Sequence, residues 1–249
     1  MIYVTGDTHG EYQRLSSRFF PEQKSMSKND YVIICGDFGI WRDDKEHRYW
    51  MDWLENRPFT TLFADGNHEN FDMLSQMPAV CWNGGLVHAI RPSVLHLMRG
   101  QGFLLGNRRV FVMGGAASHD IKDGILEPDD PDLMRKKAVL NRRGKTMYRI
   151  NHVSWWKEEM PSEEEYAAGL ETLQKWDWKT DYLITHCAPQ SLEEKIVGER
   201  TQPNRLTEYL EEINTRCRFK YWFFGHYHDN RKVTPHHICL YEQVVKVCE

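Results

Sequence analysis

The amino-acid sequence predicts an α/β fold in which central strands are covered on both faces. Short apolar runs of four or five residues, rich in β-branched and aromatic side chains, are continuous rather than alternating, as in strands that are buried on both faces. Most of these runs end at a glycine or at a polar residue. Stretches with helical periodicity lie between the runs. Together these observations favour a sheet whose ligand-binding residues follow the carboxyl ends of its strands.

The central strands are expected in the following segments: Ile2–Thr5, Tyr31–Cys35, Thr60–Ala64, Arg109–Met113, Tyr182–Thr185 and Tyr221–Phe224. A glycine after a run permits a sharp turn, and the next polar residue then lies at the carboxyl end of the strand. Residues 94–105 and 237–247 are expected to add strands, in antiparallel orientation.

Helices are expected in three of the stretches between the strands. Asp43–Glu55 carries large apolar side chains at helical spacing. Ser162–Trp176 opens with a serine followed three residues later by a glutamate, which is the pattern of a capping box. Leu206–Ile213 is the third predicted helix.

The bulk composition suits a single domain spanning residues 1–249. The chain has 249 residues, 41% of them hydrophobic, and a net charge of -4. This charge gives no bulk attraction to nucleic acid or to an anionic membrane. No run approaches the roughly 18 apolar residues of a membrane helix, and the N-terminus starts with a strand rather than a signal peptide. A cytoplasmic location without a membrane partner is therefore expected.

The cysteines are scattered and form no Cys-x-x-Cys pair, so zinc-finger and thioredoxin-like sites find no support. In a reducing compartment they are expected to be small buried hydrophobic residues. Cys187 follows His186 directly, which raises the alternative of a nucleophilic thiol. The structural role is favoured for it.

The segment around residues 116–156 is expected to be an insertion or a long functional loop. An acidic, proline-containing turn from Glu127 to Asp132 is followed there by a basic run: Arg135, Lys136, Lys137, Arg142, Arg143, Lys145 and Arg149. The run suits a solvated surface, which is slightly favoured, or a clamp for a phosphate-rich substrate. Trp155 and Trp156 could stack on a base, although packing is favoured.

Side chains of the kinds that bind metals follow most of the predicted central strands. In chain order they are Asp7, His9, Asp37, Asn67, His186, His226 and His228. Because all of them lie at the carboxyl ends of strands, we expect them to converge on one site. Carboxylate, imidazole and amide ligands suit Mn, Fe or Zn better than Ca. Two such ions about 3.5–4 Å apart can activate water and stabilise the leaving oxygen of a phosphoester.

Five motifs carry a family resemblance. They are Gly6-Asp7-x-His9-Gly10, Gly36-Asp37, Gly66-Asn67-His68-Glu69, His186 and Gly225-His226-x-His228, in this order. This series resembles the calcineurin-like metallophosphoesterase superfamily, and the chain looks most like its small prokaryotic or phage-type members. The resemblance implies a two-sheet α-β-β-α sandwich of the metallophosphoesterase type with mixed sheets.

The resemblance also implies a role for each site residue. The first metal would be bound by Asp7, His9 and His228, and the second by Asn67, His186 and His226. Asp37 would bridge the two metals. His68 would bind no metal, and would act beside the phosphate as an acid or as a stabiliser of charge. The expected cofactor is a pair of divalent or trivalent ions, Mn first, with Fe, Zn or Ni as alternatives.

Adjacency in the sequence suggests which residues orient the site. Asp65 or Glu69 is expected to orient His68, and Asp229 the pair His226 and His228. The other histidines are interpreted as structural: His47, His88, His96, His152, His236 and His237. His119 is the exception, because its glycine-rich loop follows another strand end and is expected to reach the rim of the site.

The expected substrate is a small phosphomonoester, phosphodiester or nucleotide, which a metal-activated hydroxide would attack. One alternative is a nuclease-type phosphodiesterase, although the acidic net charge argues against a long basic groove. Another is a Ser/Thr protein phosphatase. Those enzymes carry an arginine where this chain has Asp65, and a Gly-Asp-x-x-Asp-Arg-Gly block where it has Gly36–Arg42. A negative Asp65 is expected to weaken binding of a phosphoprotein dianion. A non-catalytic metal-binding module is the least favoured alternative.

Overall fold

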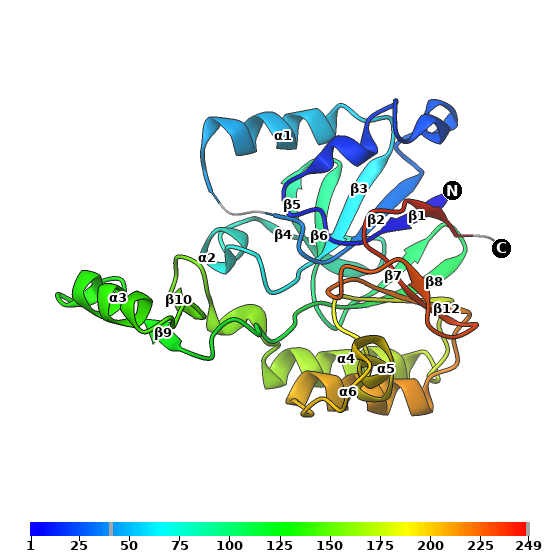
Figure 1. Ribbon diagram of the computed structural model, residues 1–249. Coiled ribbons are helices and arrows are strands. Elements are labelled where there is room, and N and C mark those ends of the chain that lie inside the picture. Colours follow the sequence, from blue (N-terminus) through cyan, green and yellow to red (C-terminus); the bar gives the residue numbers. More distant parts are fainter. Residues whose placement is uncertain (40–41, 248–249) are drawn as a thin grey trace.

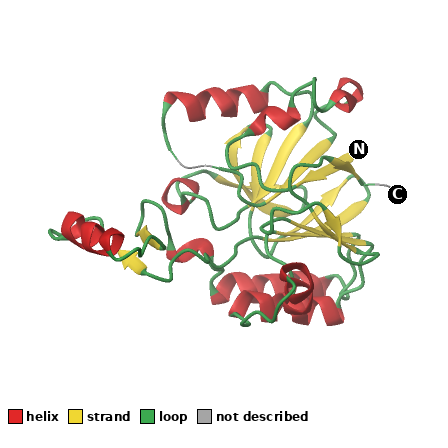
Figure 2. Cartoon of the chain, viewed as in Figure 1, coloured by secondary structure: helices red, strands yellow, loops and turns green. Residues whose placement is uncertain are grey.

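Two mixed β-sheets lie face to face between layers of helices (Figures 1 and 2). The computed structural model describes residues 1–39 and 42–247. The predicted α/β class and the implied sandwich of two mixed sheets are both confirmed. Ile40 and Trp41 of the Gly36–Arg42 block, and Cys248, lie outside the described residues.

The first sheet has seven strands in the order β15-β1-β2-β3-β6-β5-β4. They are β1 (Ile2–Thr5), β2 (Tyr31–Cys35), β3 (Thr60–Ala64), β4 (Ala79–Trp82), β5 (Gly85–Arg91), β6 (Val94–Leu97) and β15 (Val245–Lys246). β1, β2, β3 and β6 are parallel. The carboxyl ends of β1, β2 and β3 therefore lie along one edge of the sheet.

The second sheet has six strands in the order β13-β14-β12-β11-β8-β7. They are β7 (Gly102–Leu105), β8 (Arg108–Met113), β11 (Tyr182–Thr185), β12 (Tyr221–Phe224), β13 (Arg231–Lys232) and β14 (His237–Cys239). β8, β11, β12 and β14 are parallel. Side chains of both sheets, such as Ile33 and Ile184, share one buried cluster between them.

Helices cover the outer face of each sheet (Figure 1). They are α1 (Lys45–Glu55), α2 (Phe71–Leu74), α4 (Glu163–Lys175), α5 (Gln190–Val197) and α6 (Arg205–Arg216), with three short 3-10 helices, η1 (Tyr12–Leu15), η2 (Pro21–Ser25) and η3 (Lys157–Glu159). α1 buries Met51 and Leu54 in a cluster with strands of the first sheet. α4, α5 and α6 pack on the second sheet. At the start of α4, the Ser162 side chain and the Glu165 side chain form the predicted capping box.

The predicted central strands and helices are confirmed to within a few residues at their ends. The expectation for the two additional strand regions needs correction. Residues 94–105 contain two strands of different sheets, and β6 runs parallel to β3 and antiparallel to β5. Residues 237–247 also contribute to both sheets, with β14 parallel to β12 and β15 antiparallel to β1. Short runs carry the strand pattern, but pairing is decided by distant partners.

Residues 120–154 project from the sandwich and are called the arm below (Figure 1). The arm contains two short parallel strands, β9 (Gly124–Leu126) and β10 (Tyr148–Ile150), joined by α3 (Leu133–Arg142). It is therefore a structured element rather than an irregular loop. Within the described residues, α3 buries none of its side chains.

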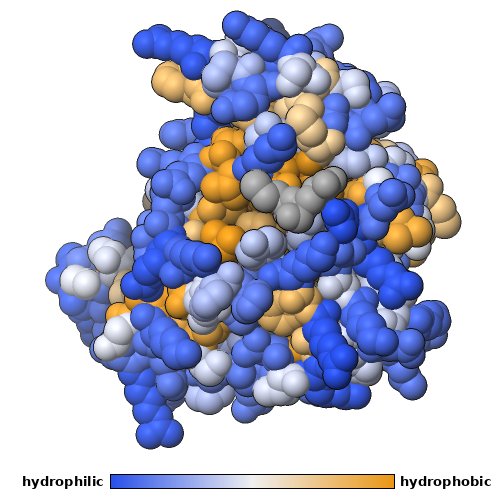
Figure 3. Space-filling view, turned by 90° about the vertical axis from the view of Figure 1, so that its right-hand side faces the viewer, coloured by the Kyte–Doolittle hydropathy of each residue, from blue (hydrophilic) through white to orange (hydrophobic). Residues whose placement is uncertain are grey.

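The face that carries the C-terminal residues lies away from the arm, and Figure 3 shows it as largely hydrophilic with separate apolar patches. A groove of about 710 Å³ at the ends of both sheets is lined by residues that include Ile2, Leu105 and Tyr182. Across the described part of the chain, no helix combines the length and apolar character needed to span a membrane.

Candidate metal centre

The seven predicted ligands all follow strands whose carboxyl ends face the same region. Loops after β1, β2 and β3 supply four of them from the first sheet, and loops after β11 and β12 supply the other three from the second. The order of supply is Asp7 and His9, Asp37, Asn67, His186, and then His226 and His228. The fold therefore brings together residues that are more than 200 positions apart in the chain, as the sequence predicts.

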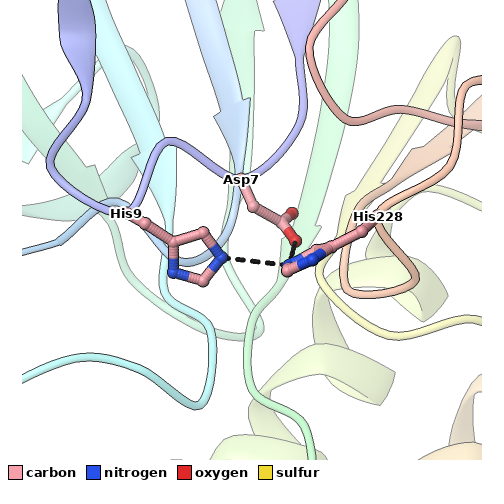
Figure 4. Close-up of side chains that lie close together, drawn as sticks. All are labelled: Asp7, His9 and His228. Atoms are coloured by element: carbon pink, nitrogen blue, oxygen red, sulfur yellow. Dashed lines mark hydrogen bonds and ion pairs between the residues drawn. The ribbon is translucent and has the colours of Figure 1, made fainter.

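Asp7, His9 and His228 form a first cluster (Figure 4). The Nε2 atoms of His9 and His228 lie 3.0 Å apart, and Nε2 of His228 lies 3.3 Å from a carboxylate oxygen of Asp7. Nitrogen ligands about 2.0–2.1 Å from one ion, with about 90–110° between them, lie about 2.8–3.4 Å from each other. The imidazole pair therefore has the spacing of two ligands of one metal ion.

A second cluster surrounds His186, whose side chain is fully buried. Its Nδ1 lies 2.8 Å from the carbonyl oxygen of Cys35. If Nδ1–H donates there, the neutral ring presents the lone pair of Nε2 to Asn67 Oδ1 at 3.3 Å and to Asp37 Oδ2 at 3.4 Å. Three acceptor atoms then face one another, which suits a cation between them. Burial disfavours the imidazolium, but Asp37 and then Asp7 raise the pKa of His186 to about 10.

Asp37 lies between the two clusters. One of its oxygens, Oδ2, is 3.7 Å from His9 Nε2 and 3.4 Å from His186 Nε2. The other, Oδ1, accepts a hydrogen bond from the backbone N–H of His68 at 2.8 Å. Burial alone favours the neutral acid, but the histidines around it, His186 first, hold the pKa of Asp37 well below its usual range. A carboxylate in this position has the geometry of a bridging ligand.

Four of the predicted ligands have left-handed backbone conformations. The φ angles are 47° at His9, 46° at Asp37, 68° at His226 and 48° at His228. Residues other than glycine rarely adopt positive φ, and they do so at a cost that the surrounding structure must offset. Here the conformation turns each side chain back from the end of its strand towards the site.

Glycine is required at Gly66 because of a close approach rather than a turn. A Cβ added there would lie 2.0 Å from Oδ1 of Asp37. We expect Gly66→Ala to displace this carboxylate and to lower activity by about 100-fold or more, since displacements near 1 Å have effects of this size. Metal content per chain and turnover of a nitrophenyl ester measure the effect. Gly106→Ala is the comparison variant, because its added methyl meets no atom within 4 Å and its cost is limited to the strain of alanine at a φ of 62°. Equal losses of metal and turnover in both variants would contradict the prediction.

His68 and His119 line a cavity of about 180 Å³ with Asp120 and several of the predicted ligands. The His68 ring lies 5.6 Å from the His9 ring, measured between centroids. His119 Nε2 lies 3.3 Å from Nε2 of His226. The expectation that the loop of His119 reaches the rim of the site is met. Asp120 belongs to the same predicted loop, although the sequence singles out only His119 within it.

The arm contributes Asp120 to the lining of the cavity beside the predicted ligands. Asp120 forms an ion pair with Arg149 of β10. Near the base of the arm, His152 Nδ1 lies 2.9 Å from a carboxylate oxygen of Asp72, and Trp156 donates its indole N–H to the same carboxylate at 2.7 Å. Trp156 is buried, which supports the packing role rather than stacking on a base.

The carboxylates that adjacency suggests as orienting groups have contacts elsewhere in the protein. Asp65 is buried, accepts hydrogen bonds from the Arg99 guanidinium, and lies 2.9 Å from His96 Nε2. Glu69 accepts hydrogen bonds from the backbone N–H groups of residues 38 and 39. Asp229 pairs with Arg231. These contacts lie within or next to the loops that carry the site. Residues that are neighbours in sequence after a strand can point in different directions, so adjacency alone does not identify the partner of a side chain.

The electrostatic argument from Asp65 also needs correction. Its carboxylate is bound within the protein by Arg99 and His96 and is almost fully inaccessible. Burial opposes its charge, but Arg99 and His96 hold its pKa low. Asp65 therefore does not present a negative charge to a bound phosphate. The absence of an arginine at this position remains a difference in sequence from the Ser/Thr protein phosphatases.

The cysteines have structural roles, with one exception. Among the described residues, Cys35, Cys187, Cys217 and Cys239 are buried free thiols, while Cys81 is exposed, contrary to the general expectation of burial. Burial raises the pKa of Cys187 to about 12. A thiol that stays protonated at neutral pH is a poor nucleophile, which supports the structural role for this residue.

The family model described as calcineurin-like phosphoesterase matches residues 1–230. The lariat debranching enzyme of Danio rerio is 22% identical over 252 residues, covering 91% of this chain and 40% of that protein. Lariat debranching enzyme A of Xenopus laevis is 22% identical over 253 residues, and the lariat debranching enzyme of Homo sapiens 21% over 247, each covering 91% of this chain and 42% of the relative. The chain thus spans about two fifths of the length of these relatives. By its match and by the residues that its strands bring together, the chain belongs to the calcineurin-like phosphoesterase family of metal-dependent phosphoesterases.

Proposed function

We propose that this protein hydrolyses phosphodiesters of nucleotides or nucleic acids at a centre of two metal ions. The observation that carries the proposal is the position of Asp37 Oδ2, which lies within 4 Å of an imidazole nitrogen from each cluster. The proposed ligands of the first ion are Asp7, His9 and His228, and those of the second are Asn67, His186 and His226. Asp37 is the proposed bridge.

The chemistry of the donor set fits such a pair of ions. When bound, two adjacent metal ions act as Lewis acids and lower the pKa of water. The protein's contribution is to hold the donors in place before substrate arrives. Asp7 is one example, since the backbone N–H of His226 donates to both of its carboxylate oxygens at 3.1 Å. Mn is the proposed metal, with Fe, Zn or Ni as alternatives.

His68 is the proposed catalytic partner that binds no metal. Its backbone N–H is held by Asp37 at 2.8 Å, and its side chain lines the cavity beside the clusters. From there the imidazole can donate a proton to the departing oxygen or stabilise developing charge. Its ring lies 5.6 Å from the ring of His9, so the proposed role is beside the two-metal centre.

The shape of the surroundings favours a diester over a bare monoester. The cavity of His68 and His119 is lined by predicted ligands, among them Asp37 and His228. A second cavity of about 320 Å³ adjoins His9 and is lined by residues that include Tyr12, Arg42 and Trp50. The additional space next to His9 suits a phosphorus that carries a second organic group. An aromatic and cationic lining is typical of subsites for nucleotides.

The names of the relatives favour a nucleic-acid substrate. The net charge of -4 for the whole chain gives no general attraction to nucleic acid. The arm is less basic at its surface than its sequence suggests, because ion pairs within the protein engage Arg135, Lys136, Lys145 and Arg149. The corresponding partners are Asp132, Asp130, Asp123 and Asp120. Arg142 and Arg143 remain exposed at the end of α3. We therefore expect the cationic side chains of the arm to contribute little to the binding of a phosphate backbone.

A substrate panel tests the proposal. Chelator-treated and Mn-loaded protein are incubated with nitrophenyl phosphate, its bis-ester, linear single-stranded DNA and a branched oligoribonucleotide. We expect metal-dependent turnover of the bis-ester to exceed that of the monoester. Cleavage of an oligonucleotide would place the activity in the nuclease class, and cleavage at the branch would match the activity for which the relatives are named. Mn-loaded protein that turns over none of the four would contradict the proposal and favour a binding module.

A further inference from the structure

A chain of hydrogen bonds leads from Asn67 to a buried carboxylate outside the predicted ligand set. The Asn67 side-chain amide donates to the hydroxyl of Ser118 at 3.4 Å. That hydroxyl donates to Oε2 of Glu159 at 2.6 Å, and the backbone N–H of Ser118 donates to Oε1 at 2.9 Å. Glu159 belongs to η3, just beyond the arm, and Ser118 to the loop that follows β8. Neither residue belongs to a motif of the sequence.

The direction of these bonds determines how the Asn67 amide is oriented. An ionised carboxylate only accepts hydrogen bonds, so the Ser118 hydroxyl uses its single proton towards Glu159. The hydroxyl can then present only lone pairs to Asn67, and the amide must turn its NH₂ group towards it. The amide oxygen is left facing His186 Nε2, at 3.3 Å.

The opposite orientation would be harmful at this position. With the amide reversed, its NH₂ group would point among the atoms that face one another around His186. An amide nitrogen offers no lone pair to a cation. The reversed Asn67 would therefore remove one oxygen ligand from the ion and place the partial positive charge of the NH₂ group beside it.

Glu159 is suited to hold this arrangement, because its side chain is buried and both of its carboxylate oxygens accept hydrogen bonds from Ser118. It is 3% exposed. Burial raises the pKa of Glu159, while the two hydrogen bonds from Ser118 act against that shift. The backbone also connects the segments, since the carbonyl of Glu159 accepts a hydrogen bond from the N–H of Ala116 at 3.2 Å. A rigid acceptor in this place can dictate the direction of the Ser118 hydroxyl.

We propose that Ser118 and Glu159 are positioning residues that hold the Asn67 amide oxygen towards the second metal ion. The inference rests on the proposed function, because it takes Asn67 to be a ligand of that ion. It also gives the segment after the arm a role in the metal centre. Partners that orient a ligand from outside the ligand set change metal affinity by about 10–100-fold when they are removed.

The test is the affinity of each site for Mn²⁺, measured by calorimetric titration of chelator-stripped protein. We expect Ser118→Ala to weaken the second binding event about 10–100-fold and to leave the first unchanged. Ser118→Thr keeps the hydroxyl and should retain the affinity. Glu159→Gln should weaken the same event, because a carboxamide can donate a hydrogen bond as well as accept one. The Ser118 hydroxyl would then no longer be forced to direct its proton away from Asn67. Ser154→Ala is the matched control, since it removes a hydroxyl near the base of the arm that accepts a hydrogen bond from the backbone N–H of Ile150.

Asn67→Ala separates failure of this inference from failure of the proposed function. Loss of the second ion in Asn67→Ala, with unchanged affinities in Ser118→Ala, would overturn the positioning role alone. Two ions retained in Asn67→Ala would overturn the ligand assignment itself. Equal weakening in Ser118→Thr and Ser118→Ala would also overturn the role of the hydroxyl. Thermal unfolding of each variant shows whether the fold is intact, and a folded Glu159→Gln keeps the inference testable if Ser118→Ala unfolds.

Discussion

Asp37→Asn is expected to reduce activity to background and to lower the metal content below two ions per chain. The Oδ1 atom of Asp37 already accepts a hydrogen bond from the backbone N–H of His68. An asparagine would keep its oxygen there and place its NH₂ group at the position of Oδ2. That position lies 3.7 Å from His9 Nε2 and 3.4 Å from His186 Nε2. A hydrogen-bond donor would then replace a negatively charged oxygen that lies near an imidazole nitrogen of each cluster.

Elemental analysis of protein purified without chelator, together with turnover of the bis-nitrophenyl ester, measures this effect. Asp52→Asn is a suitable control, because Asp52 is exposed, pairs with Arg91 and does not line either cavity beside the proposed ligands. It should leave metal content and turnover unchanged. Two ions per chain and more than a tenth of normal turnover in Asp37→Asn would refute the bridging role.

The second large effect is expected in His68→Ala. Removal of a group that transfers a proton in the transition state slows turnover by about two to four orders of magnitude. Both metal ions should be retained, because the proposed ligand set does not include His68. The backbone N–H of residue 68 remains in the variant, so the hydrogen bond to Asp37 is preserved.

Single-turnover kinetics and metal analysis separate the two parts of this prediction. Full activity in His68→Ala would exclude the proposed role in catalysis. Slow turnover accompanied by loss of a metal ion would instead make His68 part of the metal-binding structure. His88→Ala is a useful comparison, since this histidine stacks on His96 on the β5–β6 pair and is not among the cavity residues.

Much of the fold and of the candidate site is predictable from the sequence because the relevant signals are local. A continuous apolar run followed by glycine and a polar residue identifies both a strand and the loop at its carboxyl end. Asp7 and Asp37 are found this way before any tertiary contact is known. The parallel pairing of β1, β2 and β3 then brings their loops to one edge.

The parts that the sequence does not predict depend on contacts between distant segments. Asp65 lies two positions from Asn67, yet its carboxylate turns to Arg99, which is 34 residues away. Glu159 acts on the site through Ser118, and neither lies in a recognisable motif. The basic run of the arm gives no hint that Arg149 is engaged by Asp120. Such pairings arise from tertiary packing and have no periodic signature in the chain.

The left-handed conformations of His9, Asp37, His226 and His228 have a consequence for how this sequence can change over time. Each unfavourable backbone angle costs roughly 1–3 kcal/mol, and no substitution at these positions is neutral for both stability and chemistry. Glycine would relieve the angle and remove the ligand. A lineage that stopped using the centre would therefore gain stability by drifting towards glycine or asparagine at these four positions. The four angles are therefore a stability cost that accompanies the proposed metal centre.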